Sequence, residues 1–211
     1  MKNLMKTKCK AVFFDWDNTI VDTWPILLQA SNIVREHFGF PKTNLEDLKI
    51  SARRSSRESF PEVFGENWQK AYDIFYGAIQ DNKALLKPYE GTIDLVNSLR
   101  DMGYIIAVIS NKKRELLQQE IDQFQLDYDL VLGSGDSAYD KPHPELGEIA
   151  LKHFGITAAE AIYVGDSPTD WVFAKNLGMP AIAIGDDAYE GELLARLAKL
   201  DETIKKYLTG E

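Results

Sequence analysis

Residues 91–110 read GTIDLVNSLRDMGYIIAVIS and contain a complete helix-then-strand unit. The first apolar residues of this stretch fall mostly on one face of a helix: Ile93, Leu95, Val96, Leu99 and Met102. Gly103 then ends the helical pattern, as glycine commonly does at helix C-termini. Residues 104–110 follow as a near-continuous apolar run, which is typical of a strand covered on both faces.

The same order of helix, glycine and apolar strand recurs twice further along the chain. ALKHFG ends at Gly155 and AKNLG ends at Gly178, and an apolar run follows each. Five runs are expected to be buried strands: 10–15, 104–110, 128–134, 161–166 and 180–185. This alternation predicts an α/β fold, with a doubly wound parallel sheet of the Rossmann-like kind.

The region from about Val21 to Pro88 has a different pattern, because it lacks β-rich runs and shows apolar residues at helical spacing. Connections between a strand and the next element of a parallel sheet are usually much shorter. We therefore expect an α/β core domain over 1–20 and 89–211, with an inserted helical domain over 21–88. In the alternative interpretation, these helices simply cover one face of the sheet. Residues 191–208 predict an amphipathic helix near the C-terminus.

Composition and charge exclude several classes of protein. The 24 lysines and arginines are outnumbered by 33 aspartates and glutamates, and the net charge of −9 argues against a nucleic-acid partner. No apolar run approaches the roughly 18 residues of a membrane span. The basic start, MKNLMKTKCK, has no apolar segment typical of a secretory signal. A single cysteine, Cys9, suits a reducing compartment, so a cytoplasmic protein without a membrane partner is expected.

Carboxylates follow two of the expected strands. Strand 10–15 continues into DWDNT, which contains Asp15, Asp17 and Thr19, and strand 161–166 continues into GDSPTD, which contains Asp166 and Asp170. Open α/β sheets build ligand sites at the carboxyl ends of their strands. Carboxylates gathered there repel one another unless a cation joins them, and an oxygen-rich site suits Mg²⁺. In the alternative interpretation, these aspartates merely cap the following helices.

Donors for an anion follow the other strands. Ser110 ends the run 104–110 and Asn111 follows it, and Lys141 lies in DKPHP after the run 128–134. A hydroxyl, an amide and a lysine are suitable donors for phosphate oxygens. Taken singly, Ser110 could instead cap a helix, and Lys141 could be a solvated loop charge.

With DWDNT, the serine of VISN, the lysine of DKPHP and GDSPTD in this order, the chain resembles the haloacid dehalogenase superfamily. The resemblance implies that Asp15 is the nucleophile and Asp17 the general acid/base. It implies phosphoryl contacts from Thr19, Ser110, Asn111 and Lys141. It also implies Mg²⁺ bound by Asp15, the main-chain carbonyl of Asp17, and Asp166, with Asp170 in support. The superfamily often has glycine where this chain has Asn18, and asparagine tolerates unusual backbone angles.

Among superfamily members, the chain looks most similar to those of the phosphoglycolate phosphatase type, whose helical cap closes over the leaving group. SARRSSRESF resembles the arginine-bearing cap segment and offers Arg53, Arg54 and Arg57 for substrate specificity, although each could be a solvated charge. The implied function is a Mg²⁺-dependent phosphatase that acts on a small phosphorylated metabolite through an aspartyl-phosphate. The alternatives are a phosphomutase of the β-phosphoglucomutase type, a nucleotidase or pyrophosphatase, and a phospho-accepting regulatory domain. The oligomeric state is left open.

Overall fold

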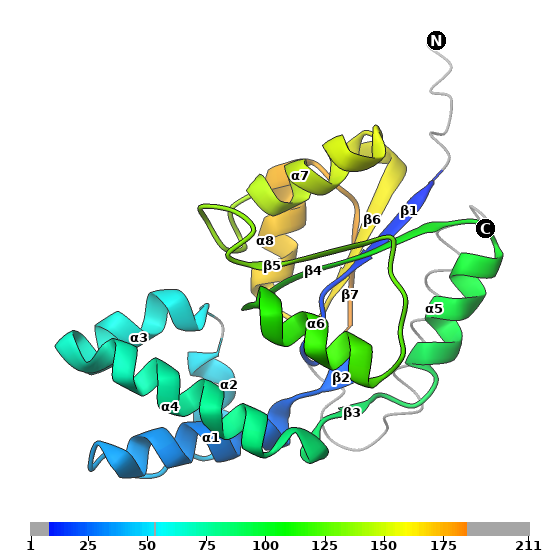
Figure 1. Ribbon diagram of the computed structural model, residues 1–211. Helices are drawn as coiled ribbons and strands as arrows, with labels where there is room; N and C mark the ends of the chain where they lie inside the picture. Colours follow the sequence, from blue (N-terminus) through cyan, green and yellow to red (C-terminus); the bar gives the residue numbers. More distant parts are fainter. Residues whose placement is uncertain (1–8, 53, 185–211) are drawn as a thin grey trace. The chain divides into compact units, whose positions relative to one another are not determined.

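The computed structural model describes residues 9–52 and 54–184, and Figure 1 shows its elements in chain order. The described residues divide into two compact units. One unit lies within Met1–Ile20 and Pro88–Glu211, and the other is Val21–Lys87. Arg53 and the helix expected over 191–208 lie outside the described residues. Among the described residues, no helix has the length and apolar character needed to cross a membrane.

The larger unit is built on a five-stranded sheet with the order β5-β4-β1-β6-β7. Its strands are β1 (Ala11–Phe14), β4 (Ile105–Lys113), β5 (Leu130–Ser134), β6 (Ala161–Gly165) and β7 (Ala181–Ala183). Every described pairing between these strands is parallel, which confirms the predicted α/β fold. All five strands lie within or overlap the predicted apolar runs. β4 continues past its run to Lys113, with an irregular register between Ile109 and Lys113.

Helices follow the strands. They are α5 (Thr92–Asp101), α6 (Arg114–Gln123), α7 (Glu145–Phe154), the single turn η3 (Ala158–Glu160) and α8 (Pro168–Leu177). The glycine pattern predicts three of these elements, α5, α7 and α8, which end next to Gly103, Gly155 and Gly178. Gly155 and Gly178 end α7 and α8 in the left-handed conformation, with φ of 64° and 68°. A residue with a Cβ atom is strained there, so glycine ends these helices at the least conformational cost.

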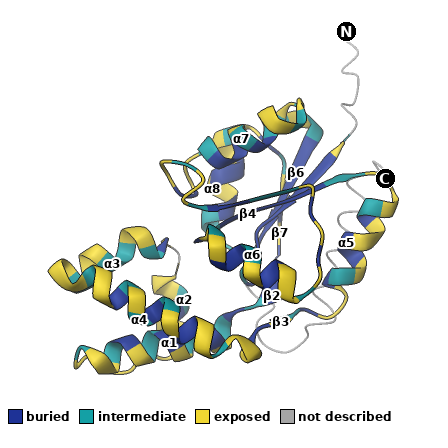
Figure 2. Ribbon diagram, in the orientation of Figure 1, coloured by how far each residue is buried: buried dark blue, intermediate teal, exposed yellow. Residues whose placement is uncertain are grey.

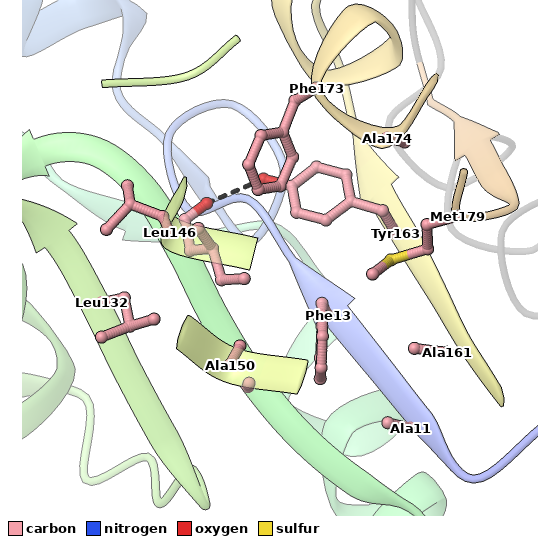
Figure 3. Packing of buried hydrophobic residues seen from close by; sticks show 12 residues of the cluster. Ala11, Phe13, Leu132, Leu146, Ala150, Ala161, Tyr163, Phe173, Ala174 and Met179 are labelled. Carbon is pink, nitrogen blue, oxygen red and sulfur yellow. Dashed lines mark hydrogen bonds between the residues drawn. The ribbon is translucent and has the colours of Figure 1, made fainter. Parts of the chain in front are cut away.

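The central strands β1 and β6 are buried on both faces, as Figure 2 shows for the dark strands of the larger unit. All four residues of β1 and all five of β6 are buried. Figure 3 shows one part of this core, where Phe13, Tyr163 and Phe173 pack with Leu146 and Ala150. Burying a large apolar side chain contributes about 1.5–3 kcal/mol each, so these layers hold the strand ends in fixed positions.

The smaller unit is mainly helical. Its elements are β2 (Val21–Asp22), α1 (Trp24–His37), α2 (Leu45–Ser51), α3 (Ser56–Phe64), η1 (Gly65–Asn67), α4 (Trp68–Asp81), η2 (Lys83–Leu85) and the start of β3 (Lys87–Pro88). α3 and α4 pack through aromatic rings, with the Phe60 and Phe75 centroids 5.3 Å apart. The short strands β2 and β3 form a two-stranded sheet that the apolar pattern did not predict.

Candidate active site

The carboxyl ends of β1 and β6, which are neighbours in the sheet, bring the predicted aspartates together. The Asp15 N–H donates to the carbonyl of Val164 at 2.9 Å, so the pairing of β1 with β6 extends into the motif. The chain then turns: Asn18 has a φ of 57°, which asparagine tolerates better than most residues. In the sheet order, the chain proceeds outward from β1 on one side and later continues on the other. Ligand sites of α/β proteins lie at such reversals of strand order.

Lys141 lies at the centre of this cluster and is only 3% exposed. Its Nζ lies 2.9 Å from Asp15 Oδ1, 2.7 Å from Asp170 Oδ1 and 2.8 Å from the hydroxyl of Tyr163. Burial alone would lower the pKa of Lys141, but the Asp15 and Asp170 carboxylates raise this pKa well above its usual value. Lys141 is therefore a buried cation, and its interpretation as a solvated loop charge is wrong.

The negative charge of the Asp15 carboxylate is only partly offset by its neighbours. Its Oδ1 atom is buried, and although Lys141 is close, no donor is aligned to form a hydrogen bond with it. Burial raises the pKa of Asp15 to about 7, which Lys141 opposes and the nearby Asp170 and Asp17 carboxylates reinforce. Asp15 therefore lies beside one buried cation and near two carboxylates that oppose its ionisation.

Asp15, Asp166 and Asp170 each offer a carboxylate oxygen within 4.8 Å of the others. Thr19 Oγ1 donates to Asp166 Oδ1 at 3.4 Å, while Asp170 Oδ2 accepts from the N–H and hydroxyl of Ser167 at the start of α8. The helix-capping interpretation therefore describes part of the role of Asp170. Since its other oxygen accepts from Lys141, Asp170 is more fully occupied than Asp15. Hard oxygen donors at this spacing fit a divalent cation such as Mg²⁺.

Ser110 and Asn111 lie near the end of β4. Asn111 forms two hydrogen bonds with the main chain of Lys141, donating from Nδ2 at 2.9 Å and accepting at Oδ1 at 2.7 Å. This pair fixes the loop that carries Lys141. The hydroxyl of Ser110 accepts from the Lys112 N–H at 3.2 Å. Because α6 begins only at Arg114, Ser110 is not its N-cap, and that interpretation is wrong.

The sequence did not single out three further polar side chains: Lys112 and Tyr163, which contact this cluster, and Glu120, which contacts Lys112. Lys112 Nζ lies 2.6 Å from Asp17 Oδ1 and 2.6 Å from Glu120 Oε2. The Tyr163 hydroxyl donates to the Ile109 carbonyl at 2.7 Å and so presents a lone pair to Lys141, as Figure 3 shows in part. In the sequence, Tyr163 looks like an ordinary core aromatic of its strand, and Lys112 is one of two adjacent lysines. Neither position therefore indicates a contact with the site.

The cap arginines belong to the smaller unit. Arg54 donates to Glu62, and its Nε lies 4.0 Å from Glu58 Oε2. Exposed ion pairs of this kind contribute little to stability. Arg57 lies exposed on α3. A role in substrate specificity for these residues stays a prediction.

Gly165, the last residue of β6, lies directly against Asp170. A Cβ atom at position 165 would lie 2.5 Å from Asp170 Cγ and 2.6 Å from Asp170 Oδ2, which is closer than real atoms approach. Gly165→Ala is therefore expected to displace Asp170 from Lys141 and to lower the free energy of unfolding by about 1–3 kcal/mol, measured by urea denaturation.

The matched control for this substitution is Gly77→Ala on the exposed face of α4, where a Cβ atom would meet nothing within 4 Å. Alanine favours a helix interior over glycine, so this control should leave the unfolding free energy unchanged or raise it by up to about 1 kcal/mol. Equal unfolding curves for Gly165→Ala and the wild type would show that Asp170 is not tightly packed against β6.

The sheet order, the acidic strand ends and the buried lysine together define an α/β protein with a charged ligand site at the carboxyl edge of its sheet. Comparison with known proteins gives the family: the model of the haloacid dehalogenase-like hydrolase family matches residues 12–184. The chain belongs to this family, which confirms the resemblance found in its four motifs, and it is an enzyme of the hydrolase class.

Individual relatives support this assignment. The chain is 31% identical over 192 residues to a phosphoglycolate phosphatase from Chromobacterium violaceum, and the match covers 83% of this chain and 85% of the relative. It is 28% identical over 200 residues to a putative pyrophosphatase from Caldanaerobacter subterraneus, covering 90% and 87%. The crystal structure of a predicted phosphatase from Clostridium acetobutylicum is similar with a TM-score of 0.79 at 22% identity, covering 94% and 99%. This last likeness supports the fold alone.

Proposed function

We propose that this haloacid dehalogenase-like phosphatase hydrolyses a small phosphorylated metabolite, phosphoglycolate or a sugar phosphate, with Mg²⁺ and through an aspartyl-phosphate on Asp15. One observation carries the proposal. Asp15 is a buried carboxylate at the end of the central strand, next to the buried cation Lys141 and within reach of Asp166. A nucleophile, a positive charge for the phosphoryl oxygens and a cation site thus lie together.

In the proposed reaction, a carboxylate oxygen of Asp15 attacks phosphorus while the bond to the leaving oxygen breaks. Asp17 donates a proton to that leaving oxygen. Asp17 then accepts a proton from a water molecule, which attacks the same phosphorus and breaks its bond to Asp15. Lys141 is positively charged because the Asp15 and Asp170 carboxylates raise its pKa well above the usual value, and Asp170 and Tyr163 hold its Nζ in place. That charge stabilises the additional negative charge of the transition state.

The metal assignment rests on the same residues. Asp15, Asp166 and the main-chain carbonyl of Asp17 would hold Mg²⁺, with Asp170 in support. When bound, Mg²⁺ supplies positive charge that lets a phosphate enter a site lined by aspartates. Thr19, Ser110, Asn111 and Lys141 are proposed to contact the phosphoryl group. Arg54 and Arg57, together with Arg53, are the proposed candidates for contacting the rest of the substrate.

A second candidate function, pyrophosphatase activity, is favoured by one observation, the 28% identity to the putative pyrophosphatase from Caldanaerobacter subterraneus. A phosphomutase would use the same nucleophile but return the phosphoryl group to a second hydroxyl. A purely phospho-accepting regulatory domain would need no helical unit like Val21–Lys87. The similarity to enzymes and the presence of the helical unit both favour the pyrophosphatase and phosphomutase alternatives over a regulatory domain.

A screen of phosphorylated compounds tests the proposal. The purified protein is incubated with Mg²⁺ and phosphoglycolate, sugar phosphates, nucleotides or pyrophosphate, and free phosphate is measured. We expect release from one or more small phosphate monoesters, and from p-nitrophenyl phosphate at a lower rate. Release from pyrophosphate alone would favour the second candidate. Interconversion of sugar phosphates without release would favour a mutase.

Loss of the metal, or of a metal ligand, should affect activity in a predictable way. Excess chelator is expected to abolish phosphate release, and added Mg²⁺ should restore it. Asp166→Ala is expected to raise the Mg²⁺ concentration for half-maximal activity by at least about 10-fold, because a direct carboxylate ligand is lost and even outer-shell partners of a metal contribute about 10–100-fold. Asp101→Ala removes an exposed carboxylate at the end of α5 and should leave the Mg²⁺ requirement unchanged. Full activity in excess chelator would rule out the metal.

A further inference from the structure

A buried row of hydrogen-bonded side chains leads away from Asp17 into the core of the larger unit. Lys112 Nζ donates to Asp17 Oδ1 at 2.6 Å and to Glu120 Oε2 at 2.6 Å. Trp16 Nε1 donates to the same Glu120 oxygen at 2.6 Å. Lys112 is 7% exposed, Glu120 is 4% exposed and Trp16 is fully buried. Two adjacent residues of the first motif are therefore tied to one glutamate of α6.

The contact with Lys112 leaves part of Asp17 accessible. The side chain of Asp17 is 24% exposed, so Asp17 remains partly accessible to solvent although it forms an ion pair with Lys112. Lys112 itself is positioned by its main chain, whose N–H donates to Ser110 Oγ at 3.2 Å. Gly133 of β5 lies against it, since a Cβ atom there would be 2.7 Å from the Lys112 carbonyl oxygen. The lysine therefore has little freedom to move away from Asp17.

Stability alone is a weak explanation for these charges. Desolvation of buried ion pairs often cancels their attraction, and well-packed apolar side chains in their place are often neutral or stabilising. Lys112 Nζ lies 2.6 Å from a carboxylate oxygen of Asp17 and 2.6 Å from one of Glu120, so two anionic partners offset the cost of burying its charge. Because the buried Lys112 ammonium group donates a hydrogen bond to the partly exposed Asp17 carboxylate, it can fix the direction in which that carboxylate points.

We propose that Lys112, held by Glu120, is a positioning residue that orients the Asp17 carboxylate for proton transfer to the leaving group and from water. The inference rests on the proposed function, because it assigns Lys112 a part in the work of Asp17. It differs from the assigned role of Lys141, which faces Asp15 and would serve the phosphoryl group.

The leaving group of the substrate separates this role from a structural one. An alkyl phosphate needs a proton on its departing oxygen, whereas p-nitrophenolate departs without one. General acid catalysis contributes about 10²–10⁴-fold, so disturbing Asp17 should affect the alkyl ester far more. The variant Lys112→Met/Glu120→Gln removes both charges together, and its glutamine still offers Trp16 an acceptor. This choice avoids leaving one buried charge unpaired.

The experiment compares kcat/KM for p-nitrophenyl phosphate with kcat/KM for the alkyl phosphate that the wild-type enzyme uses best. The double variant is expected to lose about 10²-fold on the alkyl phosphate and less than about tenfold on p-nitrophenyl phosphate. Lys113→Met is the matched control, because its side chain is half-exposed and pairs loosely with Glu115 at 3.9 Å. The control should change neither value.

A cycle with Asp17→Asn gives a second, independent test. If Lys112 acts through Asp17, adding the Lys112→Met/Glu120→Gln changes to Asp17→Asn should lower kcat/KM for the alkyl phosphate by less than about threefold further. Equal losses on both substrates, or losses that multiply in the Asp17→Asn background, would overturn the inference while the phosphatase assignment stands. Absence of Mg²⁺-dependent turnover by the wild-type enzyme would overturn the proposed function and this inference with it.

Discussion

Replacing Asp15 by asparagine is expected to lower kcat by at least about 10⁴-fold, because the amide is nearly isosteric but a poor nucleophile. The substitution also removes a carboxylate whose pKa burial raises to about 7, so it should not destabilise the fold. Phosphate release under saturating Mg²⁺ measures the effect, and circular dichroism checks the fold.

Asp101→Asn is the control for the Asp15 substitution, because it makes the same chemical change on the exposed end of α5. It should keep wild-type activity. If Asp15→Asn retained a tenth of the wild-type rate, water would be attacking the substrate directly, and the covalent scheme would be wrong.

Lys141→Met is expected to cause the second large effect, a loss of about 10²–10³-fold in kcat/KM on every phosphate ester. Methionine matches the length of lysine but leaves Asp15 and Asp170 without the charge that lies within 3 Å of each. Since Lys141 is assigned to the phosphoryl group, which all esters share, alkyl and p-nitrophenyl phosphates should lose activity equally. Steady-state kinetics on both esters measures this ratio.

Lys152→Met, in the exposed last turn of α7, is the matched control for Lys141 and should retain full activity. Because breaking a buried ion pair costs about 3–5 kcal/mol, the thermal stability of Lys141→Met is measured alongside its kinetics. A folded Lys141→Met variant that lost activity on one ester only would place Lys141 near the leaving group instead.

The fold could be predicted because its central strands are buried on both faces and therefore form continuous apolar runs. Residues 161–165 are apolar throughout, and Gly155 and Gly178 mark the helix ends that precede β6 and β7. The β2–β3 sheet escaped prediction, because strands of two residues are too short to show a period. The irregular register near Lys113 depends on contacts with β5, which no local pattern of β4 encodes.

The residues of the candidate site could be predicted where they directly follow an apolar strand, as Asp15 and Asp166 do. Hydrogen-bond partners that belong to the buried core of the fold could not be predicted. Trp16 and Glu120 are 104 positions apart, and Glu120 reads as a polar residue of an amphipathic helix until the fold buries it. Tyr163 lies in an apolar strand, and only the structure shows its hydroxyl against Lys141.

The most direct test of the proposed chemistry is the mass of the peptide that contains Asp15. The Asp17→Asn variant is incubated with p-nitrophenyl phosphate and Mg²⁺ and quenched in acid. Because this leaving group needs no proton and the variant lacks its base, the aspartyl-phosphate should accumulate. The proposed chemistry predicts one added phosphoryl group on Asp15, absent when Mg²⁺ is omitted. Release of p-nitrophenolate with Asp15 unmodified, or with the phosphoryl group on another residue, would contradict it.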